Sequence, residues 1–226
     1  MKTVIFSLLF FLSAFLGTNL SAQNYVMELN AFIEYNNINL TNSRSGSTYE
    51  DVQGTPFLYG DFAVGRVKLN NQKYYEGELR YNNYKQQLEF KNEKGEVYDV
   101  LTPENISSVK LKDVTLVYED IDGSGGFYRQ LVPGAYMLLA KDKAEYQEPK
   151  PARPYVEAKP ARFVTKNPEY FLYNAASGLV ELKNKKSLDG IYPEKSKEIQ
   201  AFVKKEKIKF SDEEDLSNLV KFLNTL

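Results

Sequence analysis

Residues 74–81 have the sequence Y-Y-E-G-E-L-R-Y, and this stretch decides the fold class. Small or apolar residues alternate along it with charged residues. One side of an extended chain carries Tyr75, Gly77, Leu79 and Tyr81, and the other side carries Glu76, Glu78 and Arg80. A period of two residues indicates a β-strand, because successive side chains point to opposite faces of a sheet. The stretch therefore predicts a strand with one buried face and one solvated face.

The sequence on both sides of this strand repeats the same pattern, from residue 56 to residue 147. Short runs rich in Tyr, Val, Phe and Leu are separated by turn residues at Asn70–Gln72, Asn92–Gly95 and Pro133-Gly134. Connections this short join antiparallel neighbours. We therefore predict a curved antiparallel β-meander of about eight strands, barrel-like if its edges pair. The pattern leaves that closure open, and it leaves open whether the tyrosines fill a core or line a pocket.

A proline-rich segment, residues 148–161, follows the predicted meander. The word K-P-A-R occurs twice around it, at residues 150–153 and 159–162. Proline fixes φ and lacks an N–H donor, so neither a helix nor a central strand fits here. We predict a semi-rigid connector of extended polyproline type, laid over the surface. The P-x-x-P spacing of Pro151 and Pro154 leaves a proline-ligand interpretation as the alternative.

The remaining residues, 162–226, predict a small strand region and two helices. Strand-like pieces lie at 162–166, 169–174 and 179–183, and helical spacing of apolar residues then follows Pro193 and continues to Lys205. Proline suits the first turn of a helix, and the lysines suit its end. The chain as a whole is therefore expected to be α+β, with this region packed on the sheet as one composite unit.

The last helix has the clearest signals in the sequence. Ser211 followed by Glu214 matches a capping box, with acidic residues in the first turn. One apolar stripe then consists of Leu216, Leu219, Val220 and Leu223. A helix pair this small is not stable alone, so the stripe is expected to pack on the sheet or on a partner.

The first 22 residues have the composition of a secretory signal peptide. Lys2 precedes an apolar run at 4–16, and small residues end at Ala22. The run is shorter than the about 20 residues that a spanning helix needs. We expect cleavage after Ala22, an N-terminal extension at 23–55 that is partly loop, and no transmembrane segment in the mature chain. A bacterial lipid anchor is attached to a Cys at the cleavage point, and the chain contains no Cys. We therefore expect an exported protein of the periplasm or extracellular space that is not lipid-anchored.

The composition also excludes several chemistries. The chain contains no His and no Cys, so Ser-His-Asp and Cys-His nucleophilic systems and His- or thiolate-based zinc sites are ruled out. Basic and acidic residues number 29 and 30, a balance that gives no footprint for nucleic acid. We expect no catalytic residues and no cofactor.

One motif suggests a metal site. Asp120, Asp122 and Ser124 place oxygen donors at positions 1, 3 and 5 of a loop that has Gly125 at position 6, as in the first half of an EF-hand calcium loop. Position 12 is Leu131, which cannot supply the bidentate carboxylate. The same residues are typical of a plain hairpin tip between two strands, which is the other interpretation.

Two stretches carry a family resemblance. They are Y-E-D-V-Q-G-T-P-F-L at residues 49–58, and the ending with S-K-E-I-Q-A-F-V-K-K at 196–205 and E-E-D-L-S-N-L-V-K-F-L-N at 213–224. Together they resemble uncharacterised exported proteins of Gram-negative bacteria. The resemblance covers roughly residues 49 to 226 and implies an envelope location. It implies no activity, because the matching residues are of a packing kind.

The expected function follows from these observations. We expect an exported cell-envelope protein that acts without catalysis, as a binding or structural module, with an envelope protein or a small apolar ligand as its unidentified partner. One alternative is a carrier of an apolar small molecule or lipid, which requires a cavity lined by Tyr and Leu. The other is a carboxylate hydrolase, for which Glu76 and Glu78, about 7 Å apart on one strand face, are the candidates.

Overall fold

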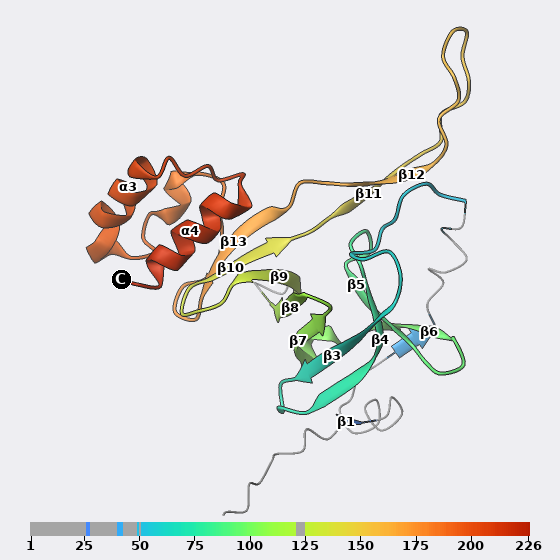
Figure 1. Cartoon of the computed structure of the whole chain (residues 1–226), viewed down its shortest axis with the longest axis horizontal. Helices are drawn as coiled ribbons and strands as arrows, with labels where there is room; N and C mark the ends of the chain where they lie inside the picture. Colours follow the sequence, from blue (N-terminus) through green and yellow to red (C-terminus); the bar gives the residue numbers. More distant parts are fainter. Residues whose placement is uncertain (1–25, 28–39, 43–48, 50, 121–124) are drawn as a thin grey trace, which may run out of the picture.

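The structure is a computed structural model that describes residues 26–27, 40–42, 49, 51–120 and 125–226 (Figure 1). The predicted signal peptide and most of the predicted extension at 23–55 lie outside the described residues. The strands are β1 Val26–Met27, β2 Leu40–Asn42, β3 Ala63–Leu69, β4 Tyr74–Asn82, β5 Gln87–Lys91, β6 Val97–Val100, β7 Ile106–Leu111, β8 Val114–Glu119, β9 Gly126–Val132, β10 Met137–Lys141, β11 Ala144–Gln147, β12 Arg162–Thr165, β13 Glu169–Asn174 and β14 Gly178–Glu181. The α-helices are α3 Ser196–Lys205 and α4 Glu213–Leu223, with short 3-10 helices at η1 Pro103–Asn105, η2 Lys185–Leu188 and η3 Pro193–Lys195.

Twelve of these strands form one sheet, almost entirely antiparallel. Its order is β14-β13-β10-β9-β8-β7-β3-β4-β5-β6-β2, with β1 paired in parallel to β4. Two meanders, β3–β6 and β7–β10, meet where β7 pairs with β3. The predicted α+β class with an antiparallel meander and two C-terminal helices is confirmed, and the question of closure is answered, because the described strands form an open sheet with β14 and β2 at its ends.

The first core lies under β3–β9 and includes the inward-facing side chains of the alternating strand β4. Leu79 and Tyr81 are buried, as the pattern predicts, and Gly77 leaves room for the ring of Tyr75, whose hydroxyl a Cβ at Gly77 would overlap. The opposite face departs from the pattern, because Arg80 is also buried. The irregular segment 53–62 covers that half of the strand, with Leu58 N–H donating to the carbonyl of Tyr81 at 2.9 Å.

The second core lies between the helices and the other end of the sheet. The stripe Leu216, Leu219, Val220 and Leu223 is buried, and it packs with Leu138, Ala140 and Leu172 of the sheet. The predicted stripe and its packing on the sheet are therefore confirmed. The predicted cap is one residue off. The N-cap is Asp212, whose carboxylate accepts from the N–H groups of Glu214 and Asp215, and not Ser211.

One long hairpin begins at the second core as the pair β10–β13 and continues outward as the pair β11–β12. β10 and β13 pair within the main sheet from Met137↔Tyr173 to Lys141↔Glu169. The register then shifts by one residue, and β11 and β12 continue as a separate two-stranded sheet from Ala144↔Thr165 to Gln147↔Arg162. The longer side of this shift contains Pro168, a residue that suits irregularities in strand pairing.

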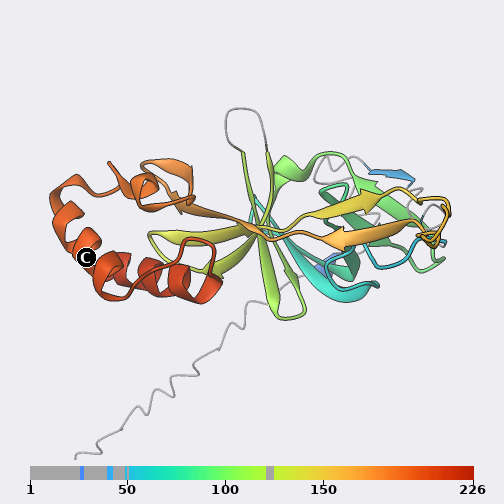
Figure 2. The same ribbon diagram turned by 90° about the horizontal axis from the view of Figure 1, so that it is seen from above.

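The proline-rich segment lies at the far end of this hairpin, and its form differs from the extended connector predicted from its prolines. Lys150 and Lys159 pair across it with reciprocal backbone hydrogen bonds of 2.8 and 2.9 Å, in the same register as β11 and β12. The two K-P-A-R words therefore face each other at their first residues, where a single polyproline helix would separate them. The segment projects away from the body and does not lie over its surface (Figure 1), and the view from above in Figure 2 shows its loop nearly end-on.

Candidate functional site

The residues of the predicted calcium loop are described only in part. Asp120 is exposed just after β8, while Asp122 and Ser124 lie outside the described residues. The part of the chain that the structure describes holds no group of three or more Asp, Glu, His or Cys placed to bind a metal ion. The flanks are the strands β8 and β9, as predicted for a hairpin. A calcium site at Asp120, Asp122 and Ser124 stays a hypothesis.

The carboxylates considered for hydrolysis each have a cation beside them. Glu76 binds Arg66 across β3 and β4 at 2.9 Å, and Glu78 binds Lys91 of β5 at 2.9 Å. These side chains are partly exposed on the open face of the sheet. Carboxylates paired with cations this way on a strand surface are typical of sheet ion pairs, and a carboxylate hydrolase at Glu76 and Glu78 stays a hypothesis.

The two inward-facing tyrosines of β4, Tyr75 and Tyr81, are buried in the core. Tyr75 packs edge-on against Phe90 with ring centroids 5.4 Å apart, and Tyr81 packs edge-on against Phe127 at 5.8 Å. Burial, and then the charge of Asp142, raise the pKa of Tyr81 above its ordinary value. This geometry supports the interpretation in which the tyrosines pack across strands.

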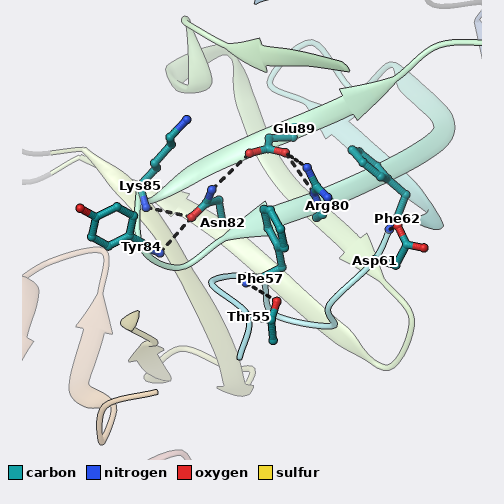
Figure 3. A network of polar contacts seen from close by, with 9 residues as sticks. All are labelled: Thr55, Phe57, Asp61, Phe62, Arg80, Asn82, Tyr84, Lys85 and Glu89. Atoms are coloured by element: carbon teal, nitrogen blue, oxygen red, sulfur yellow. Dashed lines mark hydrogen bonds and ion pairs between the residues drawn. The ribbon is translucent and has the colours of Figure 1, made fainter. Parts of the chain in front are cut away.

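A buried polar network of β4 and β5 lies against the rings of Phe57 and Phe62 from the segment 53–62 (Figure 3). Arg80 donates two hydrogen bonds to one oxygen of Glu89, at 3.0 and 2.5 Å, and the amide of Asn82 donates to the other oxygen at 3.2 Å. Glu89 is fully buried and Arg80 is 8% exposed. The rings of Phe57 and Phe62 lie 3.6 and 4.1 Å from the guanidinium of Arg80, so the cation is enclosed between aromatic faces.

A second arginine ties α4 to the sheet. Arg129 of β9 donates to both oxygens of Asp142, at 2.8 and 3.1 Å, and to both oxygens of Glu213, at 3.2 and 3.0 Å. Burial opposes the charge of Arg129, but the hydrogen bonds to Asp142 and then Glu213 outweigh burial and raise its pKa. Both arginine clusters are internally satisfied, so they hold the fold together and offer no charge to a ligand.

The candidate functional site is the arm, which we define as residues 144–165. Every residue from Glu148 to Pro160 is exposed. Beyond the ends of β11 and β12, the two sides of the hairpin form a shallow open groove. It is lined by Pro149, Lys150, Pro151, Ala158, Lys159 and Pro160. Since this segment buries no core of its own, its sequence is free to serve contacts outside the molecule.

The tip of the arm, Arg153–Val156, is a two-residue turn with an unusual occupant. The N–H groups of Arg153 and Val156 each donate to the other's carbonyl at 2.9 Å. Pro154 and Tyr155 lie between them, and Tyr155 has a φ of 64°. A turn with Pro second and a positive φ third is of type II, where Gly or Asn is favoured. Tyrosine is disfavoured here by steric repulsion of about 1–2 kcal/mol, and its side chain is 107% exposed.

The root of the arm fixes its direction. Phe163 is buried among Tyr49, Tyr84 and Tyr146, with ring centroids 4.9, 5.3 and 5.5 Å from its own. Gln53 pairs with the outer edge of β12, accepting from Phe163 N–H at 2.8 Å and donating to Ala161 at 3.0 Å. A ribbon of two strands is only marginally stable alone, so these contacts are what hold the arm out from the body.

Sequence reasoning recognised the repeated words of this segment and missed their pairing. The available signal was the dipeptide Pro154-Tyr155, which lies midway between the first residues of the two K-P-A-R words. A proline at the second position of a turn is common. The tyrosine after it concealed the turn, because the residue expected there is Gly or Asn.

In comparisons with known proteins, the chain matches no family model, no curated protein and no solved structure. Among the described residues, no helix is long and apolar enough to span a membrane.

Proposed function

We propose that this chain is an exported cell-envelope protein that acts by binding, without catalysis, and that the arm carries its partner-binding surface. The observation that carries the proposal is Tyr155, an aromatic residue held fully exposed in a left-handed conformation at the end of a projecting hairpin. Strained residues persist where the surrounding structure enforces them, and they cluster at functional positions. The composition of residues 1–22 supports export.

The charged residues of the body and of the arm support assigning stability to the body and partner binding to the arm. In the body, Arg80 and Arg129 are largely buried against carboxylates. In the arm, the described residues provide no ion-pair partner for Lys150, Arg153 and Lys159. Among the exposed residues of the tip, Tyr155 and Arg153 are of the types enriched in binding hot spots.

Site-specific crosslinking tests this proposal. Because the chain contains no Cys, an introduced thiol is the only thiol on it that can be labelled. A single thiol is introduced as Val156→Cys at the tip or as Leu101→Cys on the body, two positions that are 53% and 55% exposed. Each is labelled with a photoactivatable group in cells that make the protein. We expect a defined adduct, to a protein or a lipid of the envelope, from position 156 only.

Two further observations complete the test. The crosslinked chain should be recovered from the envelope fraction with Gln23 as its first residue. Adding Tyr155→Gly to the Val156→Cys chain should remove most of the adduct. Equal adducts from positions 101 and 156, or a chain retained in the cytoplasm, would contradict the proposal.

A further inference from the structure

We infer that the partner of the arm is an anionic lipid surface, which the tip meets end-on. This inference rests on the proposed function and names the chemical class of its partner. The surface that would meet the lipid consists of the aromatic ring of Tyr155, the apolar side chain of Val156 beside it, and three cations at Lys150, Arg153 and Lys159.

The first argument is the charge that the hairpin places together. Lys150 and Lys159 are directly opposite each other in a hydrogen-bonded pair. Like charges at this position of a sheet repel, so the pairing is unfavourable unless something anionic lies near both. Residues 150–159 contain three cations and one acid, Glu157, which gives a net charge of +2. Phosphate groups of lipid are anions that such a cluster attracts.

The second argument is the order of residues along the hairpin. Tyr155 and Val156 come first, with Arg153 beside them in the same turn. The lysine pair lies three residues behind the Arg153–Val156 pair on each side of the hairpin, about 10 Å at the rise of a strand. Tyrosine is enriched at the level of lipid headgroups, where its ring is apolar and its hydroxyl is wet. Long basic side chains near an inserted residue reach the charged headgroup layer.

The third argument separates a lipid surface from a protein partner. The cations come from both sides of the hairpin, and every residue from Glu148 to Pro160 is exposed, so no side of this segment is buried against the body. A protein groove usually selects one face of a peptide, as in strand addition or helix binding. The tip can contact a fluid planar surface whatever the rotation of the arm about its long axis. The arm also extends beyond the body in Figure 1, so a plane can touch the tip without touching the sheet.

Vesicle binding tests the inference, and the chain contains no Trp. The mature chain from Gln23 is prepared as Tyr155→Trp, and as Leu101→Trp for a matched position on the body. Vesicles consist either of phosphatidylcholine alone or of phosphatidylcholine with about one third phosphatidylglycerol, an anionic share chosen to give an appreciable surface potential. We expect the emission of Trp at 155 to shift to shorter wavelength with the anionic vesicles only. The emission of Trp at 101 should not change.

Charge variants then locate the attraction. Each basic residue close to an anionic surface contributes roughly a factor of five in binding. Lys150→Gln with Lys159→Gln should therefore weaken vesicle binding by about tenfold, allowing for their distance behind the tip. The matched control is Lys185→Gln with Lys186→Gln, which removes the same charge from two exposed lysines of η2. That control should change binding by less than about twofold, since these lysines are not on the arm.

The outcomes distinguish the inference from the proposed function. Equal binding to both kinds of vesicle, an equal loss in the η2 control, or no emission shift at position 155 would overturn the lipid inference. If position 156 nevertheless crosslinks a protein in cells, the arm binds protein and the proposed function stands. If neither vesicles nor crosslinking detect a contact at the arm, the proposed function fails as well.

Discussion

Arg80 in the body and Arg153 at the tip of the arm differ in whether the chain covers them. In the body, Arg80 is enclosed between Phe57 and Phe62 and neutralised by the buried Glu89. At the tip of the arm, Arg153 and Tyr155 are exposed, and Arg153 has no ion-pair partner among the described residues. The difference shows that the same residue types stabilise the fold where the chain covers them and remain available to a partner where it does not.

The largest effect expected from this comparison is at Glu89. In Glu89→Ala, the guanidinium of Arg80 stays buried without its counter-charge, and loss of one partner of a buried ion pair costs about 3–5 kcal/mol of unfolding free energy. Urea denaturation of the purified protein measures the change.

Glu78→Ala is the matched control, because Glu78 also pairs with a cation but is partly exposed. Surface pairs of this kind contribute about 0–1 kcal/mol. Adding Arg80→Ala to Glu89→Ala should restore part of the loss, since the uncompensated charge is then gone. A loss under about 1 kcal/mol in Glu89→Ala, like that of an exposed pair, would mean that Arg80 is not an internal tie.

A smaller effect is expected at alkaline pH from the buried phenol of Tyr81. Its pKa is raised in the folded state, chiefly by burial, whereas the unfolded chain titrates near the ordinary value of about 10. The stabilisation is therefore fully present below pH 10 and is lost as pH rises above it. At pH 11 the loss from one such phenol is about 1.4 kcal/mol.

Unfolding measured at several pH values between 9 and 11.5 tests this expectation, with Tyr81→Phe as the comparison. The variant cannot ionise at this position, so its stability should fall less steeply with pH. Parallel curves for the two proteins would show that Tyr81 does not carry the effect.

The smallest effect is expected at Tyr155, and its sign is opposite to that of a core residue. Tyr155→Gly relieves the steric repulsion at positive φ, and the added freedom of the unfolded chain offsets part of that gain. Protection of the Arg153 and Val156 amides against hydrogen exchange should therefore stay equal or rise by up to about 1 kcal/mol.

Tyr155→Ala is the control, because alanine keeps the positive φ and removes only the ring. Its tip amides should be no better protected than those of the natural chain. Lower protection in Tyr155→Gly would show that the tyrosine stabilises the turn, and the contrast between a satisfied body and a strained tip would then be lost.

The fold was largely predictable because its determinants are local. Alternation at residues 74–81 fixes one face of β4, and the stripe of α4 needs only helical spacing to be recognised. The burial of Arg80 was not predictable, since it depends on the segment 53–62 returning over β4 and β5. The cap at Asp212 instead of Ser211 is of the same kind, because both residues can cap and neighbouring geometry chooses between them.

By itself, the sequence determined the class of the fold, the absence of thiol and imidazole chemistry, and the packing face of the last helix, because composition and periodicity depend on near neighbours along the chain. Only the tertiary structure decided that the proline-rich segment folds back on itself. That outcome depends on Phe163 binding among Tyr49, Tyr84 and Tyr146 and on Gln53 pairing with β12. The contacts of Tyr49, Gln53 and Tyr84 join residues that are far apart in the sequence, and they hold the strand pair as a projecting arm with Tyr155 at its end.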